Sequence, residues 1–317
     1  MKVLLVGYSN IASRRILPAL DSLGLECIEI ATRRPEAVQS GSLKTPCKVY
    51  AGYEEGIHAS SAELCWISTV NSAHCTHAKL ALENGRHTIV DKPIGMHSLE
   101  VYELADISRK KRLLLSEAVV YTDHLRLRDT VIRLQKQGCT PRHITAVFCF
   151  PPLSADNFRR DPVLGGGALM DLGAYIVSPG RFFFGSEPVS ISAWTTERQD
   201  GMTAGMRVLL LYSEGRSFSG YFSFEGEYQN EMRIAGTNFY VHLDRCFTTP
   251  PAAETTAVFK CGNTEAQWTF PADDAFVSYL KRVTALKGSE EMEAERQTLT
   301  EDQKALTLLK SALDREN

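Results

Sequence analysis

The stretch KVLLVGYSNIA, residues 2–12, decides the fold of this protein. Its first five residues form a short apolar run that is typical of a strand buried on both faces. Gly7 ends that run, and from Ile11 to Leu23 apolar side chains recur at helical spacing. A buried strand that turns through glycine into a helix predicts the first βα unit of a parallel sheet.

The same alternation continues through the first 118 residues. Helical spacing predicts helices at 74–84 and 98–109, and Ser98 is the expected N-cap of the second helix. Repeated βα units with continuous apolar strands predict a parallel sheet that is covered by helices on both faces. Further strands are expected at 27–31, 64–68, 87–90 and 113–116.

The turn after the first strand occupies the place of the phosphate-binding fingerprint G-x-G-x-x-G/A. Gly7 permits a tight turn and Ala12 permits close helix–strand packing, but Ser9 stands where the middle glycine is expected. Backbone N–H groups at the start of the helix would hold a diphosphate. A plain strand-to-helix turn is the alternative. The residues predicted to bind a dinucleotide here are Gly7, Tyr8, Ser9, Asn10 and Ile11.

The end of the second strand discriminates between two cofactors. NAD-binding sites place Asp or Glu there, which accepts a hydrogen bond from the ribose 2′-hydroxyl. Here the residues are Thr32, Arg33 and Arg34, and a hydroxyl with two guanidinium groups suits a 2′-phosphate. We therefore expect NADP(H), with NAD(H) the less favoured cofactor. A solvated loop is the alternative role for the two arginines.

The pattern changes after residue 118. Helices are expected at 124–137 and 169–184, a strand at 144–150, and a series of strand-like runs between 189 and about 270. This order predicts an α+β domain with a large, mainly antiparallel open sheet.

The expected fold class is therefore α/β, with two domains. Residues 1–118 are predicted to form a Rossmann-type NADP-binding domain. Residues 119–317 are predicted to form a domain for substrate binding and oligomerisation, which ends in two helical segments separated by a break at 288–291.

Composition excludes several classes of protein. The chain has 317 residues, and 35 Lys and Arg against 38 Asp and Glu give a formal net charge of -3, so no general attraction to nucleic acid or to anionic membranes is expected. No stretch reaches the roughly 18 apolar residues of a membrane span. The first apolar run is too short for the h-region of a signal peptide.

The eight cysteines form no Cys-x-x-Cys pair, and several lie inside apolar strand-like runs. We interpret them as reduced thiols of a cytoplasmic protein. His74 and His77 are spaced like a pair of metal ligands, but no cluster of cysteines or carboxylates completes a site. No metal is expected.

Two further segments carry candidate catalytic residues. The tripeptide Asp-Lys-Pro at 91–93 follows a predicted strand, at the edge where open α/β sheets bind their ligands. In the segment 157–175, the glycine triplet at 165–167 permits a close approach of the backbone before a helix starts. Asp171 and Tyr175 then share one helix face at spacing i, i+4, and both can point into one site.

Together these motifs resemble the glucose–fructose oxidoreductase, inositol dehydrogenase and rhizopine-catabolism (Gfo/Idh/MocA) oxidoreductase family. Its pattern is an N-terminal Rossmann domain, a Glu-Lys-Pro motif and a Gly-Gly-Gly-x-Leu-x-Asp-x-Gly-x-His/Tyr helix. The segment 148–175 is most similar to the sugar-nucleotide 3-ketoreductase branch, although 121–124 matches its His-rich segment only in part. The sequence departs from the family pattern at Ser9, at Asp91 in place of Glu, and at Tyr175, which replaces the His of inositol dehydrogenase-like members.

The resemblance implies hydride transfer between a nicotinamide and a keto or hydroxyl group of a sugar. Lys92 is implied as the catalytic cation that polarises the carbonyl and supplies the proton, with Tyr175 as the alternative donor or as the orienter of the substrate oxygen. Asp171 would orient Lys92 or a substrate hydroxyl, and Asp91 would tie down the cofactor loop. The further residues expected to line the cofactor are Ser68, Thr69, Val70, Asn71, His74, Asp91, Lys92, Pro93 and Arg159.

The leading hypothesis is an NADP(H)-dependent reductase of a nucleotide-linked keto sugar. A dehydrogenase of a free sugar, polyol or dihydrodiol is the second hypothesis, and a non-catalytic NADP-binding sensor or scaffold is the third. The apolar runs at 208–212 and 218–224 alternate imperfectly, as if both faces of their sheet were covered. We therefore expect a homodimer or homotetramer that forms through the C-terminal sheet.

Overall fold

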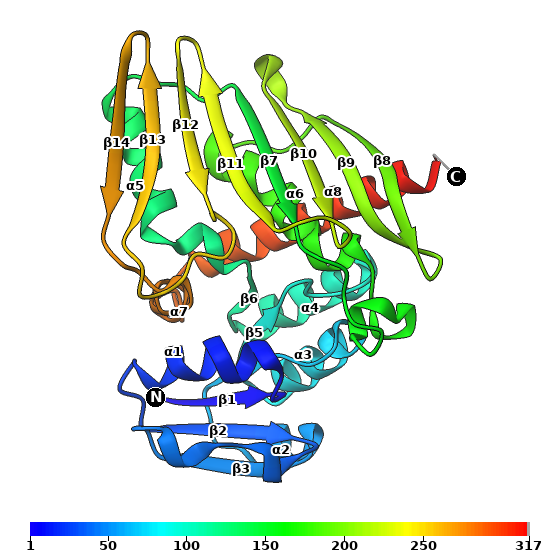
Figure 1. Ribbon diagram of the computed structural model, residues 1–317. Helices are drawn as coiled ribbons and strands as arrows, with labels where there is room; N and C mark the ends of the chain where they lie inside the picture. Colours follow the sequence, from blue (N-terminus) through cyan, green and yellow to red (C-terminus); the bar gives the residue numbers. More distant parts are fainter. Residues whose placement is uncertain (316–317) are drawn as a thin grey trace. The chain divides into compact units, whose positions relative to one another are not determined.

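The computed structural model describes residues 1–315, which form two compact units. The first unit comprises Met1–Val119 and Tyr279–Thr300, and the second comprises Val120–Ser278 and the residues from Glu301 onward. The first unit contains a six-stranded sheet and the second an eight-stranded sheet (Figure 1). The α/β fold class predicted from the sequence is confirmed.

The sheet of the first unit is entirely parallel, with the order β3-β2-β1-β4-β5-β6. The order reverses between β1 and β4, and ligands of such sheets bind beyond the carboxyl ends of the strands at this point. β3 was not predicted because it is an edge strand of which only Tyr50 is buried. The strands are β1 (Lys2–Val6), β2 (Cys27–Thr32), β3 (Cys47–Ala51), β4 (Leu64–Ile67), β5 (His87–Asp91) and β6 (Leu115–Ala118).

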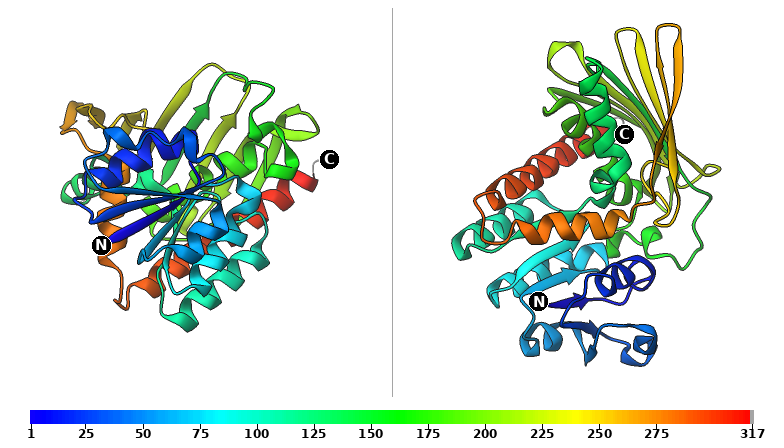
Figure 2. Two further views of the ribbon diagram at one scale, coloured as in Figure 1. Left: turned by 90° about the horizontal axis from the view of Figure 1, so that it is seen from below. Right: turned by 90° about the vertical axis from the view of Figure 1, so that its left-hand side faces the viewer.

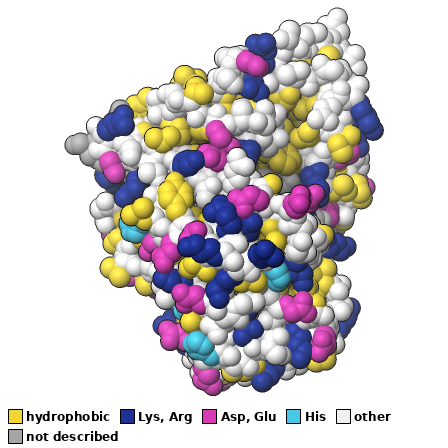
Figure 3. Space-filling view, turned by 180° about the vertical axis from the view of Figure 1, so that it is seen from behind, with side chains coloured by type: hydrophobic (Ala, Val, Ile, Leu, Met, Phe, Trp, Pro, Cys, Tyr) yellow, Lys and Arg dark blue, Asp and Glu magenta, His cyan; other side chains and the backbone are white. Residues whose placement is uncertain are grey.

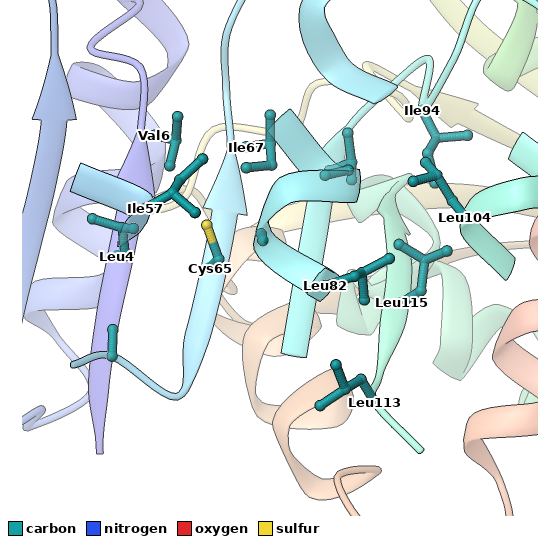
Figure 4. Packing of buried hydrophobic residues seen from close by; sticks show 14 of the residues in the cluster. Leu4, Val6, Ile57, Cys65, Ile67, Leu82, Ile94, Leu104, Leu113 and Leu115 are labelled. Atoms are coloured by element: carbon teal, nitrogen blue, oxygen red, sulfur yellow. The ribbon is translucent and has the colours of Figure 1, made fainter. Parts of the chain in front are cut away.

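Helices cover this sheet and close its core (Figure 4). Leu4 and Val6 point from β1 into a cluster that also contains Cys65, Ile67 and Leu104. Period-2 alternation along the strands sends the intervening side chains to the opposite face. The helical segments are η1 (Ala12–Ile16), α1 (Leu17–Asp21), η2 (Pro35–Ala37), η3 (Ser40–Ser42), α2 (Tyr53–Ala59), η4 (Asn71–Ala73), α3 (His74–Glu83) and α4 (Ser98–Lys111).

The predicted cap of α4 is wrong by one residue. Ser98 is the first helical residue, and His97 occupies the N-cap position with an extended backbone and no side-chain hydrogen bond to the helix. The helix is therefore held by packing of its buried apolar face rather than by a hydroxyl cap.

Residues far along the chain complete the first unit. They belong to α7 (Ala275–Ala285) and α8 (Met292–Arg315), of which Tyr279–Thr300 lies in this unit. The Tyr279 ring packs edge-on against Trp66 with 5.8 Å between the ring centres, and its hydroxyl lies 2.6 Å from Ser116 Oγ. Leu299 joins the apolar cluster behind β4 and β6.

The sheet of the second unit has the order β14-β13-β12-β11-β7-β10-β9-β8. Its neighbours are antiparallel except for β7 and β10, which pair in parallel. The predicted mainly antiparallel sheet is confirmed. Its strands are β7 (His143–Cys149), β8 (Ser190–Gln199), β9 (Met202–Leu211), β10 (Ser217–Ser223), β11 (Gln229–Gly236), β12 (Phe239–Asp244), β13 (Thr255–Cys261) and β14 (Thr264–Phe270).

Helices α5 (Leu125–Lys136) and α6 (Ala168–Phe184) lie on one face of this second sheet (Figures 1 and 2). Along β10 the side chains alternate: Phe218 and Phe222 are buried towards the helices, whereas Ser219 and Tyr221 are half-exposed on the other face. Four short 3-10 turns complete the unit: η5 (Val120–Asp123), η6 (Phe158–Arg160), η7 (Pro162–Leu164) and η8 (Ser213–Gly215).

The surface and the cysteines agree with the composition. Lys and Arg side chains are interspersed with Asp and Glu over the face drawn in Figure 3. The eight cysteines are free thiols. Among residues 1–315, no helix has both the length and the apolar character that a membrane span needs.

Candidate active site

Gly7 brings the end of β1 against the end of β4. Its φ is +104°, and a Cβ at this position would lie 2.2 Å from the carbonyl oxygen of Ser68. Any side chain would therefore push the two strands apart at the point where the strand order reverses. The tight turn expected at Gly7 has its physical reason in this contact.

Ser9 fills the position of the middle fingerprint glycine, and its side chain turns inward. Its Oγ accepts a hydrogen bond of 3.0 Å from the Ala12 N–H and lies 3.0 Å from Ser68 Oγ. Ser9 thus caps the first helix while it contacts the end of β4. The hydroxyl therefore occupies one backbone donor at the helix start, the Ala12 N–H.

Asp91, at the end of β5, is held by two residues of the neighbouring strand end. Trp66 Nε1 donates to one carboxylate oxygen at 2.8 Å, and Ser68 Oγ donates to the other at 2.6 Å. The pKa of Asp91 is raised because the carboxyl group is buried, and these hydrogen bonds together with the charges of His74 and Lys92 offset part of that rise. Ser9, Trp66, Ser68 and Asp91 are called the strand-end cluster below.

Lys92 follows this cluster directly and is half-buried, and its peptide bond to Pro93 is cis. The turn after it is anchored from two sides. His74 Nδ1, at the start of α3, lies 2.7 Å from the Pro93 carbonyl oxygen, and the Ile94 N–H donates to Glu117 Oε1 on β6 at 2.8 Å. The backbone on the carboxyl side of Lys92 is therefore fixed by buried groups.

His74 is a buried anchor. Its second ring nitrogen lies 3.1 Å from the Thr69 carbonyl oxygen, so one imidazole joins the loop after β4 to the turn after β5. Burial lowers the pKa of His74. The sequence predicted His74 either beside the cofactor or as a packing histidine at the start of a helix, and these two backbone contacts are typical of the second role.

The end of β2 carries the two arginines expected to select the cofactor. Arg33 and Arg34 are exposed, and the Thr32 hydroxyl accepts a 3.2 Å hydrogen bond from the Arg34 N–H, which shapes the turn. The Arg33 guanidinium lies 5.5 Å from the centre of the Tyr53 ring. Nearby, the Tyr8 hydroxyl accepts from the Gln39 N–H at 3.3 Å. The tight turn at Gly7 and the helix start that follows it suit the diphosphate of a dinucleotide. The exposed guanidinium groups of Arg33 and Arg34 suit a 2′-phosphate.

In the second unit, the glycine triplet packs against its own preceding loop. A Cβ on Gly166 would lie 2.5 Å from the Arg159 carbonyl oxygen and 2.7 Å from that of Asp161. Two backbone hydrogen bonds stabilise this contact. The Gly167 N–H donates to the Arg159 carbonyl oxygen at 2.8 Å, and the Gly166 N–H donates to that of Asp161 at 2.9 Å. The close approach predicted for the triplet is thus backbone against backbone.

This packing places Arg159 beside the first turn of α6. Arg159 Nε lies 3.0 Å from Asp171 Oδ2, and Asp171 is buried whereas Arg159 is partly exposed. The guanidinium also lies 4.7 Å from the centre of the Phe158 ring. Sequence reasoning named both residues but did not pair them, because twelve positions with two turns separate them.

Tyr175, one helical turn beyond Asp171, stands in an aromatic cage. Its ring centre lies 5.6 Å from that of Tyr121 and 5.2 Å from those of Phe148 and Phe247. Tyr121 is itself fixed, since its hydroxyl lies 2.7 Å from that of Ser178. Sequence reasoning missed the cage because its members come from η5, β7 and the loop after β12. Arg159, Asp171 and Tyr175 are called the α6 cluster below.

The strand order, the glycine turn and the mainly antiparallel second sheet define a class of protein: a two-unit protein whose first unit has a dinucleotide-binding Rossmann fold. Comparison with known families gives a finer assignment. Residues 1–119 match the oxidoreductase family with an NAD-binding Rossmann fold, and residues 136–242 match the GFO/IDH/MocA C-terminal domain. The chain belongs to the Gfo/Idh/MocA oxidoreductase family.

Two relatives are similar over most of their length. The chain is 29% identical to dTDP-3,4-didehydro-2,6-dideoxy-alpha-D-glucose 3-reductase of Saccharopolyspora spinosa over 265 residues, which cover 82% of this chain and 79% of the relative. It is 28% identical to D-xylose 1-dehydrogenase (NADP(+)) 2 of Haloferax volcanii, over 86% of this chain and 84% of the relative.

A solved structure shares the fold. A 3-ketoreductase from Actinomadura kijaniata, solved in complex with NADP and TDP-benzene, superposes with a TM-score of 0.87 at 23% identity. The alignment covers 100% of this chain and 97% of that one.

Proposed function

We propose that this protein is an NADP(H)-dependent reductase that transfers a hydride to a keto group of a nucleotide-linked sugar. The observation that carries the proposal is the occurrence, in one chain, of Lys92 on an anchored strand end and of the Arg159–Asp171 pair beside Tyr175. The similarity to a dTDP-sugar 3-reductase supports a nucleotide-linked substrate.

The first unit is proposed to hold the cofactor. The turn at residues 7–11 would bind the diphosphate, Arg33 and Arg34 the 2′-phosphate, and residues 68–71 with His74 would line the nicotinamide side. When bound, the nicotinamide supplies the hydride. An NADP-dependent relative and a fold neighbour solved with NADP support the choice of NADP(H).

Lys92 is the proposed catalytic cation. Its ammonium group would polarise the substrate carbonyl and donate a proton to the oxygen. Tyr175 would donate to or orient the same oxygen, and its caged ring needs little further ordering for that task. The Arg159–Asp171 pair would fix a substrate hydroxyl, with Arg159 also within the proposed cofactor contacts.

A matched panel tests the proposal. The purified protein is assayed with NADPH and with NADH against a dTDP-linked 3-keto sugar, the corresponding 4-keto sugar and free aldoses. We expect turnover of the nucleotide-linked ketone with NADPH and a much lower kcat/KM with NADH. Turnover of free aldoses alone would contradict the nucleotide-linked substrate, and a preference for NADH would contradict the assignment of the arginines.

A second candidate is the oxidation of a free sugar, polyol or dihydrodiol. It is favoured by the similarity to the xylose dehydrogenase and by a 25% identity to trans-1,2-dihydrobenzene-1,2-diol dehydrogenase of Xenopus laevis, over 74% of this chain and 71% of the relative. The same panel, run in the direction of NADP reduction, separates the two candidates.

We also propose that copies of the chain associate through the second sheet, as a dimer or a tetramer. The face opposite the helices exposes 41% of Trp194 and 43% of Leu211, and burial of these apolar side chains against a second copy would favour association. Light scattering at micromolar concentration tests this, and a monomer would contradict it. The eight free thiols support a cytoplasmic location.

A further inference from the structure

Four hydrogen bonds run in one line through the strand-end cluster. The Ala12 N–H donates to Ser9 Oγ at 3.0 Å, Ser9 and Ser68 hydroxyl oxygens lie 3.0 Å apart, and Ser68 donates to Asp91 Oδ2 at 2.6 Å. The other carboxylate oxygen receives the Trp66 indole N–H at 2.8 Å.

When Asp91 is ionised, the protons in this line have only one arrangement. A serine hydroxyl carries a single proton, and that of Ser68 is committed to the Asp91 carboxylate. Ser9 must therefore donate to Ser68, while its own oxygen accepts from Ala12. Each dipole points towards the carboxylate, so each bond strengthens the next, and all of them favour the ionised form of Asp91.

We propose that Ser9 is a positioning residue, which holds Asp91 ionised and in place beside Lys92 by donating through Ser68. The inference deepens the proposed function, because Lys92 is the catalytic cation of that proposal. It gives Ser9 a role that the fingerprint does not, since the fingerprint has glycine at this position.

The inference also links two departures from the family pattern noted in the sequence. The carboxylate of Asp91 reaches both Trp66 and Ser68 of the adjacent strand. A glutamate would carry its carboxylate about 1.5 Å further out, because it has one more carbon. The serine at 9 and the shorter acid at 91 are thus complementary parts of one hydrogen-bond line.

Two other titratable groups act on Asp91: His74 from α3 and the adjacent Lys92. Glu117 on the neighbouring β6 pairs with Val90 and accepts from the Ile94 N–H. His74 and Lys92 both lower the pKa of Asp91, whereas burial raises it. By donating to Ser68, Ser9 would act in the same sense as these two groups. Removal of its hydroxyl should therefore raise the pKa of Asp91.

The Trp66 indole N–H provides a test that needs neither substrate nor cofactor. The chain has only three tryptophans, so their indole resonances in an ¹⁵N NMR spectrum are few, and Trp66→Phe assigns the relevant one. This resonance is followed against pH in the wild type, Ser9→Ala, Ser9→Gly and Ser9→Thr. The ring protons of His74 report its own titration in the same samples.

We expect the midpoint of the Trp66 titration to move to higher pH in Ser9→Ala and Ser9→Gly and to stay near the wild-type value in Ser9→Thr, which keeps a hydroxyl. The matched control is Ser13→Ala, because Ser13 lies one turn on and its hydroxyl donates to the Asn10 carbonyl oxygen at 3.1 Å, away from Asp91. An unchanged midpoint in both Ser9→Ala and Ser9→Gly would overturn the inference. Ser9→Gly restores the fingerprint residue, so a well-folded sample is expected.

Kinetics provide the second arm. With the substrate identified by the panel above, Ser9→Ala should lower kcat/KM by about 3- to 10-fold, the effect of one hydrogen bond. The same change in an Asp91→Glu background should have less effect, because the line is already broken. A shifted Trp66 midpoint without turnover of any carbonyl would refute the proposed function alone. Full turnover with an unshifted midpoint would refute the role of Ser9 alone.

Discussion

The strand-end cluster and the α6 cluster place their polar groups by different physical means. In the strand-end cluster, parallel strands end side by side, and side-chain hydrogen bonds of 2.6–3.0 Å join them. In the α6 cluster, backbone-to-backbone packing at Gly166 positions Arg159, and aromatic rings enclose Tyr175. The first arrangement follows from sheet topology, whereas the second depends on loops and on packing from distant segments.

This difference teaches where substitutions should act. A polar change in the strand-end cluster should alter charge and pKa with little loss of folding free energy. A change in the packing that positions the α6 cluster, such as one at Gly166, should alter stability first, because this packing is close. The variants below test that contrast.

The largest effect is expected from Lys92→Ala. Loss of a positioned proton donor lowers kcat by about 10²- to 10⁴-fold. The side chain is half-exposed, so the thermal midpoint should stay close to that of the wild type. Steady-state kinetics on the true substrate and thermal unfolding measure the two quantities. A variant with near-normal turnover would show that Lys92 is not the catalytic cation.

Gly166→Ala should destabilise the protein by about 1–3 kcal/mol, because the new methyl group meets two backbone carbonyl oxygens that cannot move independently. Chemical denaturation measures the free energy of unfolding. The control is Gly41→Ala, since nothing lies within 4 Å of a Cβ there and its φ is not positive. Equal stability of the two variants would contradict the tight packing of the triplet.

Arg33→Ala should raise the KM for NADPH by about 10-fold or more and leave the KM for NADH unchanged. A charge-assisted hydrogen bond to the 2′-phosphate contributes about 1.5–3 kcal/mol, and NADH has no such group. Initial rates with both cofactors measure the effect. Arg14→Ala, another exposed arginine on the first helix, is the control. Parallel losses with both cofactors would count against a 2′-phosphate site.

Tyr175→Phe should have the smallest effect of the four on folding, because the aromatic ring keeps its contacts. If Tyr175 orients the substrate oxygen, kcat falls by about 10-fold, the worth of one hydrogen bond. A fall as large as that of Lys92→Ala would identify Tyr175 as the immediate donor instead. Unchanged kinetics would remove it from the reaction.

Much of the first unit could be predicted from the sequence. Apolar runs that end in polar residues identify the strands. Because the strands are parallel, residues at their carboxyl ends, such as Ser68 and Asp91, are expected at one edge of the sheet. The side-chain partners there were not predictable, since the inward turn of Ser9 and the bond from Trp66 depend on rotamers and on strand spacing.

Less of the second unit could be predicted from the sequence. The sequence predicted its sheet type, α6 and the shared face of Asp171 and Tyr175. It did not reveal Phe247 beside Tyr175 or Arg159 beside Asp171, because such contacts between distant segments leave no periodic signal. β14 was also not predicted, because it follows β13 through a short turn and buries only Trp268 and Phe270.

The segment Tyr279–Thr300 determines when the first unit can complete its folding during synthesis. Because Tyr279 packs on Trp66 and Leu299 fills the core behind β4 and β6, the first unit lacks part of its interior until those residues leave the ribosome. The first unit therefore reaches its final form only after residue 300 has been synthesised. A nascent chain that stalls before residue 279 would expose Trp66 and the core beside it to chaperones and proteases.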